Sequence, residues 1–266
     1  MKNRRRKAMR KIYRKEMIVP IILFSIFSTL SYASTRVLNE NFDNQAIIQP
    51  TIGSITVNQY GRSNLTPPEY NLTQVGVGGT GYTFSSGTIW EAYLQWNYGR
   101  AWSSDEIYVS YWLRYPRYVA PSHDVNAKIF YPHWDGLTSY VHYSMFDDHT
   151  LYYSAVSKGS TLSAGNYINC PGNTDGNWHH YEFWIKLSTA QSRFWYDGTL
   201  KIDHNYSDGV WGNNIDYLTF GSIDGNDIDD FSRQFDSIEV WDGMPDGTPD
   251  TTHTIQNCTI IGGGIR

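Results

Sequence analysis

Hydrophobic and polar residues alternate with a period of two along much of this chain. Three segments show the pattern most clearly, at residues 105–115, 139–146 and 178–187. Strands with one packed face and one open face have this period, so we predict a strand at each of them. No segment shows a sustained helical period.

Other short segments are also typical of strands, because they are rich in aromatic and β-branched residues and are bounded by turn residues. They cover residues 37–42, 54–59, 89–96, 127–131, 151–156, 193–196, 200–203, 216–221 and 234–241. The dipeptide Asp197-Gly198 lies between two of them and predicts a β-hairpin. More than ten short strands separated by turns predict an all-β sandwich or jelly roll.

The first 33 residues have the pattern of a secretory signal peptide. Nine lysines and arginines precede an apolar run, and Ser31-Tyr32-Ala33 is typical of a cleavage site. The alternative is a membrane anchor, but the run at 18–30 is shorter than the ~20 residues that a spanning helix needs, and it contains Pro20. We therefore expect a signal peptide at 1–33, one domain at 34–247, a tail at 248–266, and a secreted or periplasmic protein without a stable membrane anchor after cleavage.

Removal of this leader makes the remaining chain strongly acidic. The whole chain has a formal charge of −5; without the nine basic residues and one acid of the leader, 12 basic and 25 acidic side chains remain, a charge near −13. Nucleic-acid binding rests on neutralisation of phosphates by Lys and Arg, so we expect no nucleic-acid partner. The same balance disfavours polyanionic glycans, though less strongly. We expect a monomer.

Two cysteines, Cys170 and Cys258, are present, and 87 residues lie between them. In an oxidising compartment they could form a disulfide. Spacing alone does not show that they meet. No neighbouring His or Cys spacing supports a metal or nucleophile role.

Two motifs make the chain resemble the concanavalin A-like lectins and glucanases, including laminin-G-like domains. The first comprises residues 178–186 (WHHYEFWIK) followed by 193–198 (RFWYDG), and the second is residues 235–241 (FDSIEVW). The resemblance spans roughly residues 37–241. It implies a concanavalin A-like jelly-roll sandwich of two antiparallel sheets, in which the strand at 235–241 pairs beside the first strand. The fold hosts lectins, hydrolases and lyases alike, so it does not specify the function.

The resemblance also implies a glycan-binding groove on the concave side of one sheet. If the three alternating segments lie in that sheet, the groove presents side chains that suit sugar faces and hydroxyls. The expected substrate-binding residues are Trp112, Arg114, His180, Glu182 and Trp184, with Tyr140, His142 and Lys128 beside them. The alternative is that such residues lie on the convex face or pack in a satellite cluster. An aromatic content of 16% already requires some exposed rings.

The sequence leaves open whether the protein is an enzyme. Laminarinase-like glucanases use an E-x-D-x-E strand, because retaining hydrolysis needs two carboxylates ~5 Å apart. This chain has no such triplet, so we do not expect a retaining glucanase. The residues 111–132 resemble a strand, loop and lysine-bearing strand of jelly-roll alginate and glucuronan lyases, although the Gln-Ile-His and Arg-x-Glu-Leu motifs are missing. In a lyase, Lys128 would neutralise the uronate carboxylate, and His142, Tyr140 or Tyr152 would transfer protons.

We therefore expect an exported carbohydrate-binding domain that recognises a polysaccharide or oligosaccharide. The first alternative is a polysaccharide lyase acting by β-elimination on a uronic-acid-containing glycan. The second is a structural or adhesion protein.

Calcium is the one cofactor that the resemblance implies, because related proteins often tie the first and last strands with Ca²⁺. The matching positions are Glu40, Asp43 and Asp236. No organic cofactor is expected.

Overall fold

The computed structural model describes most of the predicted domain. The described residues are 34–58, 63–67, 70–79, 81–86, 93–97, 102, 104–117, 127–134, 139–145, 150–157, 160–205, 211, 215–223 and 232–246. The chain divides into two compact units, residues 1–32 and 33–266, and all described residues belong to the second. The predicted leader and tail lie outside them. Within the described part, no helix is long and apolar enough to cross a membrane.

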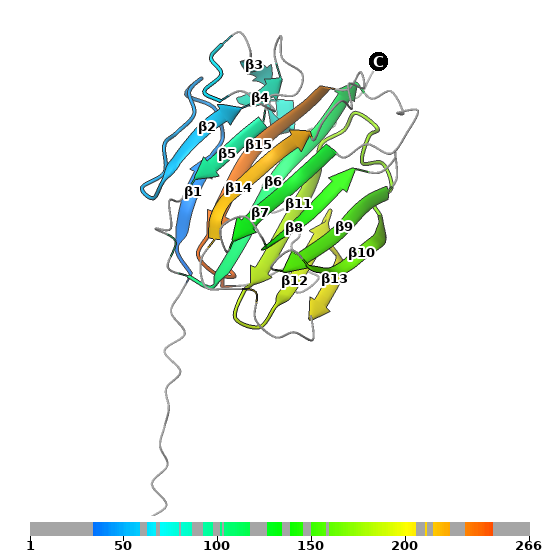
Figure 1. Cartoon of the computed structure of the whole chain (residues 1–266). Coiled ribbons are helices and arrows are strands. Elements are labelled where there is room, and N and C mark those ends of the chain that lie inside the picture. The colour runs from blue at the N-terminus through cyan, green and yellow to red at the C-terminus, as the bar shows by residue number, and fades with distance from the viewer. Residues whose placement is uncertain are drawn as a thin grey trace, which may run out of the picture. The chain divides into compact units, whose positions relative to one another are not determined.

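Fifteen strands and one short 3₁₀ turn make up the described secondary structure (Figure 1). They are β1 (Arg36–Glu40), β2 (Ser54–Asn58), β3 (Tyr70–Val75), the 3₁₀ turn η1 (Val77–Gly79), β4 (Tyr82–Ser86), β5 (Tyr93–Asn97), β6 (Glu106–Arg117), β7 (Ala127–Trp134), β8 (Ser139–Met145), β9 (Thr150–Ser157), β10 (Ser160–Asn169), β11 (His179–Lys186), β12 (Gln191–Tyr196), β13 (Thr199–Asn205), β14 (Ile215–Ile223) and β15 (Ser232–Trp241).

The strands form two antiparallel sheets packed face to face. Sheet A has the order β13-β12-β11-β6-β15-β4-β3, and β1 pairs with β15 as an eighth strand. Sheet B has the order β10-β9-β8-β7-β14-β5-β2. In Figure 1 the strands of both sheets run along the same diagonal, as in an aligned sandwich. The protein is thus an all-β jelly-roll sandwich, as the period of two predicts.

Two local predictions are confirmed by the strand pairing. The strand at the end of the domain pairs with the first strand, with Leu38 opposite Val240. The hairpin at Asp197-Gly198 joins β12 to β13 by a two-residue turn. Both turn residues have positive φ, 48° and 71°, as a type I′ turn requires.

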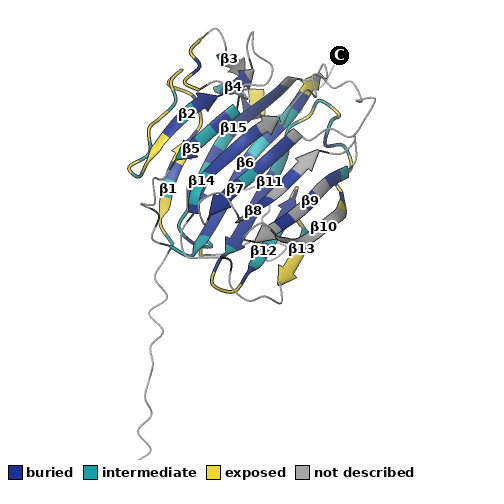
Figure 2. Cartoon of the chain, in the orientation of Figure 1, coloured by how far each residue is buried: buried dark blue, intermediate teal, exposed yellow. Residues whose placement is uncertain are grey.

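Aromatic rings fill the space between the sheets. Tyr111 of sheet A stacks on Phe183, with ring centroids 5.7 Å apart, and meets Phe220 of sheet B edge-on at 5.7 Å. Phe130 of sheet B stacks on Phe183 at 4.4 Å. Figure 2 shows buried residues along the central strands and exposed residues at the edge strand β13. The side chains that alternate with these buried ones therefore form the outer faces of the sandwich.

A hydroxyl in this core joins the two sheets at an irregular point of β7. The Tyr111 hydroxyl donates to the carbonyl of Ile129 at 2.9 Å. The register between β7 and β8 shifts between Lys128 and Phe130, so Ile129 lies at a β-bulge. A buried carbonyl costs free energy unless it is hydrogen-bonded, so the Tyr111 hydroxyl stabilises the bulge.

We expect Tyr111→Phe to lower the free energy of unfolding by about 1–3 kcal/mol, because it leaves the Ile129 carbonyl buried without this donor. Tyr181→Phe is the matched control. The Tyr181 ring stacks on Tyr111 at 5.8 Å, and its buried hydroxyl has no hydrogen-bond partner among the described residues. This control should be neutral or slightly stabilising in urea unfolding. Equal losses in both variants would contradict the bulge argument.

Candidate functional site

The residues expected to share one groove lie on two different sheets. Trp112 and Arg114 are on β6 and His180, Glu182 and Trp184 are on β11, and both strands belong to sheet A. Lys128 of β7 and Tyr140 of β8 belong to sheet B. The expectation of a single groove is therefore wrong. A period of two shows that a strand has an open face, but not to which sheet the strand belongs.

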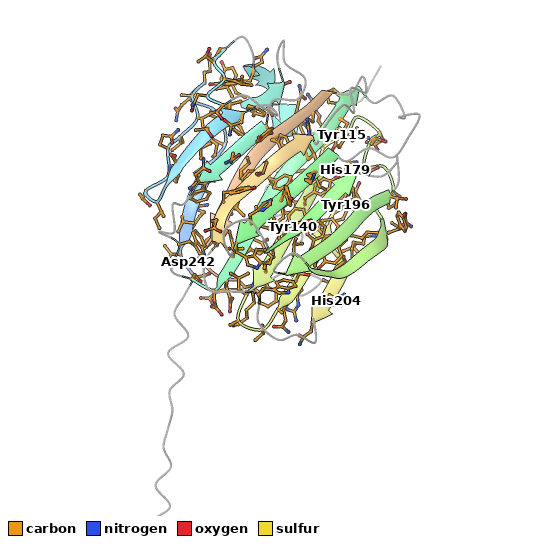
Figure 3. The ribbon with its side chains drawn as sticks, viewed as in Figure 1. Tyr115, Tyr140, His179, Tyr196, His204 and Asp242 are labelled. Atoms are coloured by element: carbon orange, nitrogen blue, oxygen red, sulfur yellow. The ribbon has the colours of Figure 1, made fainter. Side chains whose placement is uncertain are left out.

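The outer face of sheet B carries an aromatic cluster formed by Tyr131, His133, Tyr140 and Tyr217. The His133 ring is at its centre, with centroid distances of 4.0 Å to Tyr131, 5.3 Å to Tyr140 and 4.4 Å to Tyr217. His133 is 5% exposed, and the three tyrosines around it are partly exposed. Figure 3 labels Tyr140 among the side chains of this sheet. The cluster spans β8, β7 and β14, three adjacent strands.

Lys128 reaches the same face because of the bulge in β7. It lies three residues before Tyr131, so plain alternation would place the two side chains on opposite faces. With the register shift after Lys128, its Nζ lies 4.9 Å from the centroid of the Tyr131 ring. The lysine is 3% exposed. A buried cation beside aromatic rings is stabilised by their π faces.

A row of amides continues this outer face across β5 and β2. Gln95 donates from Nε2 to Asn97 Oδ1 at 2.7 Å and accepts from Asn58 Nδ2 at 3.2 Å. On β14, Tyr217 is paired with Asn97 and Thr219 with Gln95, so the amides adjoin the aromatic cluster. Sheet B thus presents rings, a cation and hydrogen-bonding amides side by side.

Two of the predicted proton-transfer residues are described only in their backbone. His142 is paired with Ser154, and Tyr152 with Ser144, in the neighbouring strands β8 and β9. Their side chains lie outside the described part of the chain, so these roles stay predictions. Sequence reasoning missed His133 because the strand was expected to end at residue 131, before Pro132. The signal that would have found it is the continued alternation of Phe130 and Trp134 with His133.

Part of the outer face of sheet A is closed by its own side chains. Tyr108, Trp184 and Trp195 are 3–7% exposed and pack together. Arg193 Cζ lies 5.2 Å above the Trp184 ring. Glu182 is 3% exposed and accepts from the Tyr108 hydroxyl at 2.5 Å. Burial and the Glu182 carboxylate raise the pKa of Tyr108, so this hydroxyl stays protonated and donates. Trp184 and Glu182 therefore belong to a packed satellite cluster.

The rest of the predicted set on sheet A is partly exposed. Trp112 lies opposite His180, with ring centroids 4.9 Å apart. Two residues further along β6, the Arg114 guanidinium lies 4.7 Å from the ring centroid of Trp178. We call these four side chains the Trp–Arg patch.

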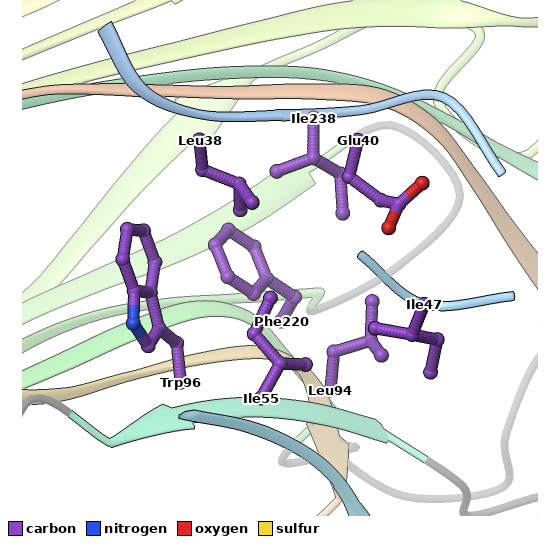
Figure 4. Close-up of a pocket in the computed structure, with 8 residues that line it drawn as sticks. All are labelled: Leu38, Glu40, Ile47, Ile55, Leu94, Trp96, Phe220 and Ile238. Carbon is purple, nitrogen blue, oxygen red and sulfur yellow. The ribbon is translucent and has the colours of Figure 1, made fainter. Parts of the chain in front are cut away.

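Glu40, one of the predicted calcium ligands, organises a turn. Its two carboxylate oxygens accept from the backbone N–H groups of Phe42, at 2.7 Å, and of Ile48. Figure 4 shows it beside an apolar cavity that Trp96 and Phe220 also line. Burial, and to a lesser extent the charge of Asp236, raises the pKa of Glu40. Each Glu40 oxygen thus already accepts one backbone hydrogen bond, and its role as a calcium ligand stays a prediction.

The other two predicted ligands, Asp43 and Asp236, line one polar pocket with Asn41 and Ser237. Asp43 accepts from the backbone N–H of Tyr82 at 3.1 Å, and Asp236 accepts from that of Val77 at 2.7 Å. Their oxygens suit the ligand preference of Ca²⁺. Among the described residues, however, no group of three or more His, Cys, Asp or Glu side chains could hold a metal ion. Calcium at this pocket stays a prediction.

Comparisons with known proteins show the fold of this chain. No protein-family model and no curated protein matches it. Among solved structures, 310 chains match. One belongs to botulinum neurotoxin type C, which depends on two ganglioside molecules to enter cells; the TM-score is 0.56 at 11% identity, over 79% of this chain and 48% of that one. The binding domain of serotype G has a TM-score of 0.55 at 10% identity, over 79% and 48%.

A third match is domain 4 of AbnA, an extracellular GH43 arabinanase from Geobacillus stearothermophilus, in complex with arabinotriose. Its TM-score is 0.55 at 15% identity, over 79% of this chain and 94% of that one. The chain spans about half the length of the neurotoxin chains and nearly all of the arabinanase domain. At these identities the likeness shows a shared all-β fold.

Cys170 is buried, and burial raises the pKa of its thiol to about 12. Cys258 lies outside the described residues, so the disulfide between them stays a prediction.

A histidine joins the loop before β11 to the β12–β13 hairpin. His179 Nδ1 lies 2.8 Å from Asp197 Oδ2, and its Nε2 lies 3.2 Å from Asp175 Oδ1. The ring also stacks on Tyr196 at 5.1 Å, and Figure 3 labels both residues. An imidazole donates from both nitrogens only when it is protonated. Burial alone would lower the pKa of His179, but the two carboxylates outweigh it and raise this pKa.

The raised pKa predicts a pH-dependent stability. Protonated His179 stabilises the fold fully below its unfolded pKa of about 6.5, and this contribution is lost as the pH rises through the higher folded pKa. We expect the difference in melting temperature between the wild type and His179→Asn to be larger at pH 6 than at pH 8.5. His204→Asn, at an exposed position of β13, is the control. A difference that does not change with pH would refute this account.

Proposed function

We propose that this domain binds carbohydrate on the outer face of sheet B. The observation that carries the proposal is the aromatic cluster of Tyr131, His133, Tyr140 and Tyr217, which lies beside Lys128 and the amide row. Aromatic rings suit the CH faces of sugars, and amides fix the orientation of hydroxyl groups.

The position of the cluster supports a binding role. It lies at the middle of sheet B, where the three central strands meet, and its tyrosines are held by the buried His133 ring. Side chains fixed by their neighbours lose little conformational entropy when a ligand binds. The arabinanase domain in complex with arabinotriose and the ganglioside-dependent neurotoxin support a carbohydrate ligand by analogy of fold.

The same face supports a second candidate, a uronate-specific polysaccharide lyase. In β-elimination a base removes the C5 proton, the C4–O4 bond breaks with its electrons moving to O4, and a C4=C5 double bond forms. Lys128 would neutralise the uronate carboxylate, and Tyr140 or His133 would move the protons. The observation that favours this candidate is the chain of contacts from Lys128 to Tyr131, at 4.9 Å, and from Tyr131 to Tyr140, at 5.2 Å.

The binding proposal predicts that Tyr140→Ala combined with Tyr217→Ala weakens oligosaccharide binding about tenfold or more, equivalent to at least ~1.4 kcal/mol. The measurement is calorimetric titration of the best ligand from a glycan array. Tyr167→Ala is the matched control, because this tyrosine is 58% exposed on the edge strand β10, three strands from β7. Wild-type affinity in the double variant would overturn the proposal.

The lyase candidate predicts a rise in ultraviolet absorbance, from the unsaturated product, when the protein is mixed with a uronic-acid polysaccharide. Lys128→Met should abolish the rise while keeping the volume of the buried side chain. Lys201→Met is the control, because Lys201 also lies over a tyrosine ring, with its Nζ 6.0 Å from the Tyr196 centroid on the other sheet. A flat trace with every uronan would exclude this candidate and leave the binding proposal intact.

A further inference from the structure

The outer face of sheet A, opposite to the proposed binding face, combines a closed and an open region. In the closed region Tyr108, Trp184 and Trp195 bury one another almost completely. In the open region, the indole rings of Trp112 and Trp178 stay partly exposed. Both regions include residues of β6 and residues in or directly before β11, and the closed region also includes Trp195 of β12.

Each partly exposed indole of the Trp–Arg patch adjoins a nitrogen-bearing group. The antiparallel register places His180 opposite Trp112, and the Arg114 guanidinium lies over the ring of Trp178, two residues before His180. Indoles therefore occupy one diagonal of a two-by-two array, and a guanidinium and an imidazole occupy the other. Adjacent strands are ~4.8 Å apart and alternate residues ~6.7 Å apart, so the array has about the size of one sugar ring.

Neighbouring side chains fix both nitrogen-bearing groups. Arg114 donates from Nε to Oε1 of Gln234, whose side chain is buried at 4% exposure. The Nδ1 atom of His180 lies 3.4 Å from Oε2 of Glu182, and Glu182 is in turn held by the Tyr108 hydroxyl. A guanidinium with a fixed plane suits a carboxylate, which it binds through two parallel hydrogen bonds. Pre-organised groups of this kind lower the entropic cost of binding.

We infer that the Trp–Arg patch is a second binding site, separate from the cluster on sheet B, and that it recognises a single hexuronate unit of an otherwise neutral polysaccharide. Arg114 binds the sugar carboxylate, and the indoles of Trp112 and Trp178 contact the sugar ring. One carboxylate per site agrees with the acidic composition of the chain, which disfavours polyanions. With two sites on opposite faces, one protein molecule connects two polysaccharide chains.

The test compares two oligosaccharides that differ by one carboxylate, glucuronosyl-xylotriose and xylotriose. Calorimetric titration is carried out with full-length protein carrying Tyr140→Ala and Tyr217→Ala, so that the sheet B face does not contribute. We expect glucuronosyl-xylotriose to bind with a stoichiometry of one and xylotriose to bind at least tenfold more weakly. Arg114→Gln should remove this preference, and Arg114→Lys should reduce it, because lysine keeps the charge but lacks the planar fork.

Arg193→Gln is the matched control, because Arg193 also lies over a tryptophan of sheet A but in the closed region. It should keep the preference. Circular dichroism in the aromatic region verifies that each variant is folded, and Trp112→Phe provides a second variant that retains a ring but weakens binding. Equal affinity for the two oligosaccharides, or unchanged affinity in folded Arg114→Gln, would overturn the inference. Neither result bears on sheet B, because Tyr140 and Tyr217 are already replaced in every protein of this test.

Discussion

The structure depends on the packing of aromatic rings between two sheets, and each tyrosine or tryptophan in that packing also brings a hydroxyl or an indole N–H group into the core. Tyr111 illustrates both parts, because its ring contacts Phe183 and Phe220 while its hydroxyl donates to a carbonyl. That carbonyl belongs to Ile129 at the bulge, and the bulge places Lys128 on the outer face. The bulge that provides a hydrogen-bond acceptor for Tyr111 in the core is therefore also the reason why Lys128 lies on the outer face. The indole N–H of Trp96 is satisfied in the same way, since it donates to the carbonyl of Ile52 at 2.7 Å, whereas the buried hydroxyl of Tyr181 has no hydrogen-bond partner among the described residues.

The sandwich also explains why the aromatic and charged side chains of this protein form two separate groups, one on each outer face. Strands that look alike in sequence, such as β6 and β8, lie in different sheets, so their polar faces point away from each other. Each outer face consequently has its own combination of rings and charges. On sheet B a lysine and a histidine lie among tyrosines, while on sheet A an arginine and a histidine lie among tryptophans. The first set offers hydroxyl groups and the second a planar cation, so the two proposed binding sites differ in the chemical groups that they offer to a ligand.

Much of the fold could be predicted from the sequence, because in long strands with a regular period the alternation of apolar and polar residues shows which side chains are buried. The strands at β6, β8 and β11 and the hairpin at Asp197-Gly198 are of this kind. Three strands, β3, β4 and β10, were missed. Two of them are short, and β10 (STLSAGNYIN) is an edge strand with small and polar residues, so it lacks a continuous apolar face. Such strands are specified by their neighbours and not by their own composition.

The candidate site could be predicted only in part. Residue types were found correctly where alternation is regular, as at Trp112, Arg114 and His180. The sheet to which each strand belongs depends on long-range pairing, which no local pattern records. The place of Lys128 depends on a bulge, and that of His133 on a strand that continues through Pro132. Prolines are usually found at strand ends or edges, so a central strand containing one contradicts the local signal.

The pairing of β1 with β15 has a consequence for how the chain acquires its structure. Arg36 contacts Glu239 across 203 residues of sequence, and Thr35 contacts Asp242 beside them. β1 is synthesised before the other described strands, but its edge of the sheet is complete only after β15 has been synthesised and has paired with it. Contacts so distant in sequence slow folding, because a long loop must close before any stabilising energy is gained. During synthesis this edge of the sandwich therefore stays open until nearly the whole domain has emerged from the ribosome.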